Sequence, residues 1–176
     1  GDIIITAHQP AGIFYGIQTL LQMLPPEIKN SQKQKGIDWT VPCTDITDKP
    51  QFAWRGLMLD VSRHWFTKEE VKKYIDELAE YKMNVFHWHL TDDQGWRLEI
   101  KSLPRLTEVG AWRAPRVGQW WQRAPQQPGE ETTYGGFYTQ EDVKEVLAYA
   151  AERYVRVIPE IDVPGHSLAA LVAYPD

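Results

Sequence analysis

Ionisable side chains follow three apolar runs of the sequence, at the point where each run ends. Asp60 and Arg63 come after the first run, Asp92 and Asp93 after the second, and His166 after the third. Carboxylates, an imidazole and a guanidinium are groups that transfer protons and bind polar substrates. A single charged residue often begins a solvated loop, but buried strands rarely end in so many ionisable groups by accident. The pattern therefore predicts an active site.

Two histidines, His87 and His89, offer a rival chemistry. Side chains at i and i+2 of a strand point to the same side, so this pair could share a metal ion, with Asp92 and His166 as further ligands. The pair lies before the strand end, however, where barrel side chains fill the interior rather than reach a substrate. Interior histidines without a metal or another cofactor are therefore expected. Their expected polar neighbours are Asp60, Glu160 or Asp162.

Continuous apolar runs predict the three strands that carry these side chains. They cover Leu57–Val61, Val85–Leu90 and Val155–Ile161. Runs without polar alternation are typical of parallel strands that are buried on both faces. In a barrel the carboxyl ends of the strands face the active site, so the three polar clusters are expected on one side of the fold.

Two helices are predicted between these strands, over about 68–81 and 140–153. Each follows a threonine that has an acidic residue three positions later, which is the pattern of a capping box. The alternation of strand and helix predicts an α/β fold with right-handed crossovers. A Rossmann sheet needs a glycine fingerprint after its first strand, and the chain reads Ser62-Arg63-His64 there. A partial TIM (β/α)8 barrel fits better, with three of its roughly eight units present.

The N-terminal part differs in pattern from the rest. A short β-branched run, Ile3–Thr6, precedes an amphipathic helix predicted over about 12–24, which Pro25 and Pro26 end. A polar connector follows, with a second short strand signal at Trp39–Val41. We expect a boundary after this segment, with residues 1–46 as one part and 47–176 as the other.

Composition excludes several classes of protein. The formal net charge of −5 gives no basic field for nucleic acid or an anionic membrane. Cys43 is the one cysteine, so an intrachain disulfide or a cysteine-based zinc site is excluded. No run of about 18 apolar residues predicts a membrane span, and the first residues do not read as a secretory signal.

A long loop between Leu103 and Tyr138 is rich in aromatic residues and glycine. Its notable members are Trp112, Trp120, Trp121, Tyr134, Gly135, Gly136, Phe137 and Tyr138. Long loops in compact domains usually have a function, and aromatic faces suit the apolar faces of sugar rings. Packing of the loop onto the barrel explains the same residues equally well.

Three ordered motifs resemble the β-N-acetylhexosaminidases of glycoside hydrolase family 20. They are FAWRGLMLDVSRH at 52–64, FHWHLTDDQGW at 86–96 and PEIDVPGH at 159–166. The segment before them, with GIQTL at 16–20, is similar to the end of the small α/β domain that precedes the barrel in this family. The resemblance implies that 1–46 ends that small domain and that 47–176 is the first part of the catalytic barrel.

The resemblance also implies roles for three residues. Arg63 is expected to hydrogen-bond the hydroxyls of a terminal N-acetylhexosamine, which suits its rigid fork of donors. Asp92 and His166 are expected to form a polar chain toward the catalytic glutamate and to lie within hydrogen-bonding reach of each other or of one shared water. They would support proton transfer by orienting the acid and tuning its pKa.

Members of this family use the substrate's own acetamido oxygen as nucleophile, beside an adjacent Asp-Glu pair. The Asp-Glu dipeptide in these 176 residues is Asp76-Glu77, which falls inside a predicted helix. The chain is therefore expected to stop before the catalytic pair and to be inactive alone, with the remainder of its own barrel and N-acetylhexosamine glycans as partners. Family habit suggests export from the cell. The rival interpretations are a non-catalytic sugar-binding barrel and a metal-dependent hydrolase.

Overall fold

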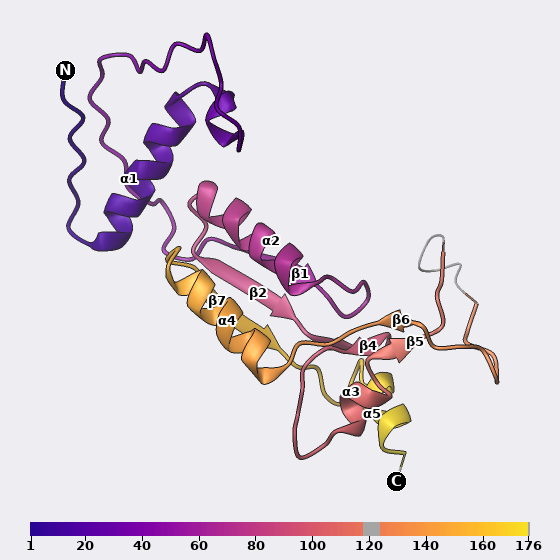
Figure 1. The fold of residues 1–176 in the computed structure, drawn as a ribbon. Helices are drawn as coiled ribbons and strands as arrows, with labels where there is room; N and C mark the ends of the chain where they lie inside the picture. The colour runs from indigo at the N-terminus through magenta and orange to yellow at the C-terminus, as the bar shows by residue number, and fades with distance from the viewer. Residues whose placement is uncertain (118–123, 176) are drawn as a thin grey trace.

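A parallel sheet of three strands lies at the centre of the computed structural model, which describes residues 1–117 and 124–175 (Figure 1). The strands are β1 (Gly56–Asp60), β2 (Val85–His89) and β7 (Arg156–Glu160), in the order β1-β2-β7. The ladder places Asp60 opposite His89 and His89 opposite Glu160. The three strands end at one level, as the apolar runs predict.

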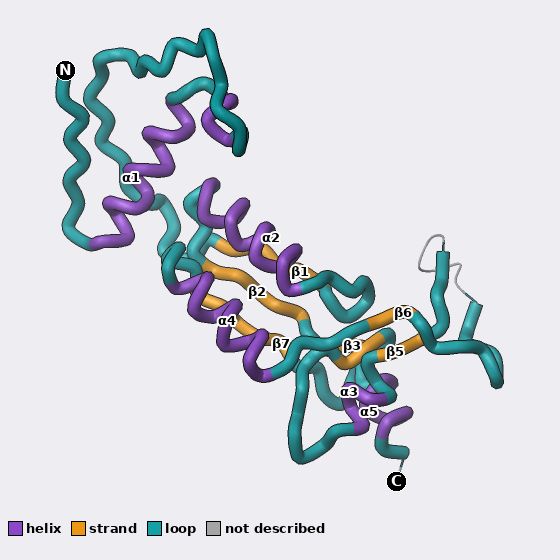
Figure 2. Tube along the Cα trace, viewed as in Figure 1, coloured by secondary structure: helices purple, strands orange, loops and turns teal. Residues whose placement is uncertain are grey.

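Helices α2 (Lys68–Glu80) and α4 (Gln140–Ala151) connect the strands and cover one face of the sheet (Figure 2). Both begin with the predicted capping box, in which the threonine side chain accepts the N3 amide and the acidic side chain binds the threonine amide. Lys68 of α2 reaches across to α4, with its Nζ 2.7 Å from Asp142 and 2.6 Å from Glu145. The two helices therefore pack as neighbours, as successive crossovers of a barrel do.

Alternate residues of β2 face opposite sides. Phe86 and Trp88 are buried beneath the helices, whereas His87 and His89 face the uncovered side. The core beneath the helices contains further buried side chains, namely Val61, Val71, Ile75, Leu78, Leu90, Tyr138, Val146, Ala150 and Val155. This arrangement confirms the first part of a (β/α)8 barrel, with its helical layer outside and its histidines inside.

Shorter elements lie beyond the carboxyl ends of the strands. They are β3 (Thr91–Asp92), β4 (Gly95–Trp96), α3 (Arg105–Glu108), β5 (Trp112–Arg113), β6 (Tyr134–Gly135) and α5 (Leu168–Ala173). Strands β3 and β4 form one antiparallel pair, and β5 and β6 form another. Figure 1 shows these elements grouped at the end of the sheet toward which the β2 arrow points.

The N-terminal part contains helix α1 (Pro10–Met23) and the 3₁₀ helix η1 (Pro26–Lys29). The predicted strands at Ile3–Thr6 and Trp39–Val41 are wrong, because no described strand lies beside either segment to complete a ladder. Ile5 nevertheless packs on α1, where a Cβ at Gly16 would come within 2.5 Å of its Cγ2. Within residues 1–117 and 124–175, no helix has the length and apolar character needed to cross a bilayer.

Candidate active site

An ion pair between Arg63 and Asp92 joins the ends of β1 and β2. The Nη2 atom of Arg63 lies 2.6 Å from Oδ2 of Asp92, and Nη1 lies 2.6 Å from Oδ2 of Asp60. The Asp92 side chain is only 1% exposed, whereas the Arg63 side chain is 42% exposed. Two carboxylates thus hold one edge of the guanidinium while the rest of it remains open to a ligand.

The carboxylate of Asp60 accepts hydrogen bonds from the turn that leads into Arg63. Asp60 Oδ1 accepts the amides of Ser62 and Arg63 at 3.0 and 2.9 Å. Burial raises the pKa of Asp60, but the hydrogen bonds from the Arg63 amide and guanidinium outweigh it, so that this pKa falls below its ordinary value. Asp60 is therefore an anion that fixes both the main chain and the side chain of Arg63.

His166 approaches the same buried carboxylate from the loop after β7. Its Nδ1 lies 3.4 Å from Asp92 Oδ1 and 3.8 Å from Asp93 Oδ2. This proximity of Asp92 and His166 is confirmed. The loop that carries His166 is tied back by Asp93, whose Oδ1 accepts the amide of Leu168 at 3.1 Å at the start of α5. The three residues proposed from the sequence therefore share one cluster, centred on Asp92.

The histidines of β2 pair with polar groups on the uncovered face of the sheet. His87 Nε2 forms an ion-pair contact with Glu160 of β7. His89 is buried, with Nε2 2.9 Å from the carbonyl oxygen of Thr91 and 3.3 Å from Asp92 Oδ2. Pairing with Glu160, one of the expected neighbours, is confirmed for His87. His89 contacts the buried carboxylate of Asp92.

Two groups of side chains in the described residues bring ligand atoms close enough for a metal ion. One consists of His89, Glu160 and Asp162, and the other of Asp92, Asp93 and His166. His87 belongs to neither group, so the rival site built on His87 and His89 is not assembled here. Asp92, the buried donor of the second group, already pairs with Arg63, which favours the non-metal interpretation for that group.

The described aromatic residues of the long loop mostly pack against the barrel. Tyr138 is buried between Trp65 and Trp88, and its hydroxyl donates to the Phe66 carbonyl at 2.6 Å. The Tyr134 hydroxyl accepts the Trp65 amide and lies 3.0 Å from His64 Nδ1. Trp112 is partly exposed at the start of β5, and Trp120 and Trp121 lie outside the described residues.

Arg97 is an important residue that the motif reading missed. Its side chain is fully buried and donates to main-chain carbonyls of three segments rather than to a carboxylate. Burial lowers its pKa to about 10, which leaves the guanidinium charged at neutral pH. The available signal in the sequence was an arginine flanked by two apolar residues, Trp96 and Leu98, and two positions after Gly95.

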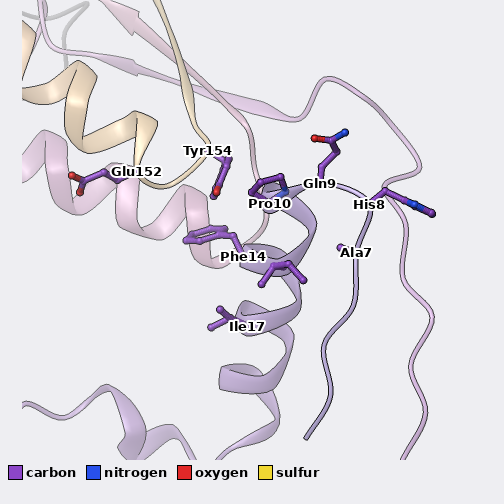
Figure 3. Close-up of a pocket in the computed structure, with 9 residues that line it drawn as sticks. Ala7, His8, Gln9, Pro10, Phe14, Ile17, Glu152 and Tyr154 are labelled. Carbon is purple, nitrogen blue, oxygen red and sulfur yellow. The ribbon is translucent and has the colours of Figure 1, made fainter.

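A hollow bordered by apolar side chains lies at another place. A hollow of about 610 Å³ is bordered by the start of α1 and by Glu152 and Tyr154 after α4, with Phe14 and Ile17 along one wall (Figure 3). It is at the amino ends of the strands, away from Asp92. We therefore assign the chemistry to the carboxylate cluster rather than to this hollow.

Sequence comparison agrees with this arrangement of residues. The sequence model of "Glycosyl hydrolase family 20, catalytic domain" matches residues 52–176, and that of "Glycosyl hydrolase family 20, domain 2" matches residues 1–49. The chain belongs to glycosyl hydrolase family 20. The family 20 motifs that carry Arg63, Asp92 and His166 thus lie within the matched catalytic region.

Curated family 20 relatives are similar along nearly the whole chain. A beta-hexosaminidase of Porphyromonas gingivalis is 51% identical over 98% of this chain, and one of Vibrio furnissii is 49% identical over 99%. Among solved structures, Streptomyces plicatus N-acetyl-beta-hexosaminidase in complex with Thio-NAglucal matches 96% of the chain with a TM-score of 0.80 and 47% identity. The chain spans 20% and 26% of the two curated relatives and 31% of the solved structure.

Proposed function

We propose that the protein carrying this chain removes terminal non-reducing N-acetyl-β-D-hexosamine residues from glycans, with retention of configuration. The observation that carries the proposal is the Asp92-centred cluster, in which an open guanidinium and a histidine meet on one buried carboxylate. A solved relative from Vibrio harveyi, an exo beta-N-acetylglucosaminidase at 45% identity, is in complex with N-acetylglucosamine. Such a sugar is uncharged, which suits a site whose charges are already paired.

Arg63 is proposed to bind the sugar hydroxyls. Its Nη1 donates to Asp60 and its Nη2 forms an ion pair with Asp92, and the two contacts hold the guanidinium plane in one orientation. The exposed N–H groups can then donate to two adjacent hydroxyls, because a guanidinium presents its donors in a fixed fork. The fixed orientation lowers the entropy lost when the sugar binds.

Asp92 and His166 are proposed to position the proton donor rather than to act on the sugar. Asp92 Oδ1 accepts the Asp93 amide at 2.7 Å and lies near His166 Nδ1, so one ring nitrogen is directed at a buried carboxylate. The other nitrogen, Nε2, is then directed away from Asp92, toward the side of the ring where the resemblance places the catalytic glutamate. The glutamate would protonate the leaving oxygen while the acetamido group attacks the anomeric carbon.

The remainder of the barrel is the proposed partner of this part of the chain. Among the strands of the described residues, β1 and β7 each have a partner on one edge only. Leu57 and Met58 of β1 and Leu171 and Val172 of α5 are exposed apolar side chains. Further strands and helices of a closed barrel would cover such surfaces. We also propose the division into 1–46 and 47–176 as the boundary between the small domain and the barrel.

The test is the hydrolysis of a chromogenic N-acetyl-β-D-glucosaminide by the full-length natural protein and its Arg63→Ala variant. Loss of the charged donors should lower kcat/KM by about 10- to 100-fold, since a hydrogen bond to a charged group contributes about 1.5–3 kcal/mol. Arg153→Lys, a change at the contact between α4 and Asp76 of α2, is the matched control and should retain activity. Unchanged kcat/KM in Arg63→Ala would exclude the proposed role.

A further inference from the structure

We propose that Arg97 is a positioning residue that holds the main chain of Arg63 in its sugar-binding place. The inference rests on the proposed function of Arg63 and adds a residue that lies behind the site, out of reach of substrate. Arg97 is a buried arginine whose hydrogen-bond partners are main-chain carbonyls.

The guanidinium of Arg97 is fully buried, and all the hydrogen-bond acceptors that the structure gives it are main-chain carbonyls. They belong to three segments that are distant in sequence and meet behind Arg63. The acceptors are Val61 at 3.2 Å, Ser62 at 2.8 Å, Gly136 at 3.1 Å and Ala111. One side chain thus fastens the end of β1 to the segments around β5 and β6.

Two glycines leave the space that this guanidinium occupies. A Cβ at Gly95 would lie 2.3 Å from Cζ of Arg97. Gly135 has φ +152°, and a Cβ there would lie 2.0 Å from the Ala111 oxygen and 3.1 Å from Nη1 of Arg97. The Trp65 ring covers the group, with its centroid 5.7 Å from Cζ. The cavity is therefore built around a planar cation, which a lysine ammonium would not fill in the same way.

The contacts of Arg97 reach the two residues directly before Arg63. Its Nε donates to Val61 and its Nη2 to Ser62, while the Ser62 hydroxyl donates to the Gly95 carbonyl at 2.6 Å. Arg113 holds the next carbonyl, that of Arg63 itself, at 3.1 Å. The main chain leading into Arg63 is thus held from behind, while Asp60 and Asp92 hold its side chain in front.

Loss of the Arg97 contacts would change the position of the main chain at Arg63. Without Arg97, the carbonyls of Val61, Ser62 and Gly136 lose this buried donor, and the end of β1 can shift relative to β3 and β6. Asp92, on β3, would then no longer meet the Arg63 guanidinium in its present orientation. A displaced guanidinium would lose hydrogen bonds to the sugar, and a hydrogen bond to a charged group contributes about 1.5–3 kcal/mol. Because Arg63 is proposed to bind the sugar in ground and transition states alike, the loss should fall mainly on KM.

A double-mutant cycle with Arg97→Lys and Arg63→Ala, in the full-length natural protein, tests the inference on the chromogenic N-acetylglucosaminide. Arg97→Lys should raise KM by about 10-fold or more while kcat changes by less than about 3-fold. In the Arg63→Ala background the same change should add less than about 3-fold, since the effect acts through Arg63. The matched control is Arg153→Lys, which alters an exposed arginine contact with Asp76 on the helical side and does not touch the site.

Two results would overturn the inference. One is an unchanged KM in Arg97→Lys with only a lower Tm, and the other is a full multiplication of the two effects in the double variant. A normal KM in Arg63→Ala would instead contradict the proposed function of Arg63, so the two failures are distinguishable. If Arg97→Lys does not fold, Gly95→Ala displaces the same guanidinium without removing it. It should show the same rise in KM, and an unchanged KM there would count against the inference.

Discussion

The Nδ1 atom of His166 lies 3.4 Å from Oδ1 of Asp92, so the loop after β7 meets the residue that follows β2. The other oxygen of the same carboxylate, Oδ2, forms an ion pair with Arg63, which follows β1. One buried anion therefore links the residue proposed to bind the sugar with the residue proposed to position the acid.

Replacement of Asp92 by asparagine should lower kcat/KM for a chromogenic N-acetylglucosaminide by about 10- to 100-fold, the range found when a group that orients another is removed. The variant keeps the shape of the side chain but loses the charge that pairs with Arg63 and His166. Asp76→Asn, in the contact between α2 and α4, is the control of equal chemistry and should stay near the parent value. Equal effects of the two variants would contradict the assigned role.

The 176-residue chain alone should not hydrolyse the chromogenic substrate. Its Asp-Glu dipeptide, Asp76-Glu77, lies within α2 on the outside of the sheet, so this glutamate is not placed to protonate the leaving oxygen. Acid-base catalysis contributes roughly 10²- to 10⁴-fold, which binding by Arg63 cannot replace. Turnover by a purified sample shown by mass spectrometry to contain only this chain would disprove the mechanism, provided that His166→Ala abolishes it.

Removal of metal ions should leave the activity of the full-length protein unchanged. Asp92 already pairs with Arg63, so a cation held by Asp92, Asp93 and His166 would have to displace an existing contact. Dialysis against a chelator, followed by elemental analysis and an activity assay, checks this. Stoichiometric zinc or manganese that is lost together with activity, and with binding that His89→Ala weakens, would restore the metal-hydrolase interpretation.

Acid should weaken the contact between α2 and α4. Hydrogen bonds from Lys68 and from Thr139 lower the pKa of Asp142 from its ordinary 3.8 to about 2. A carboxyl group whose folded pKa is depressed stabilises the fold above the unfolded pKa and loses that contribution as the pH falls through the folded value. The Tm difference between the parent and Asp142→Asn should therefore shrink between pH 4 and pH 2. A difference that stays constant over this range would contradict the assignment.

The elements of the barrel could be predicted because their signals are local. Thr67 and Thr139 mark the first residues of α2 and α4 through their own side-chain hydrogen bonds. The apolar runs located all three parallel strands to within one residue at each end. Asp92 and His166 could be brought together because parallel strands end on one side of a sheet.

Other features depend on contacts that a sequence pattern does not contain. The segment at Ile3–Thr6 has the composition of a strand, but a ladder requires a neighbour, and no described strand lies beside it. Arg97 has main-chain carbonyls as partners, and these have no side-chain signature. Its importance becomes visible only when β1, β5 and β6 are placed around it.

Apolar rings and histidines alternate along β2, so the strand register that buries the rings also places the histidines on the side of the site. Phe86 and Trp88 occupy the helix-covered face, and His87 and His89 occupy the other. A slip of one residue would turn both imidazoles into the apolar layer under α2 and α4 and expose both large rings, because side chains of a strand alternate between faces. A misregistered chain would therefore lose stability in two ways, because it would bury polar groups and would lose apolar contacts. The alternation of the five residues of β2 therefore favours the strand register that also places the residues leading to Asp92.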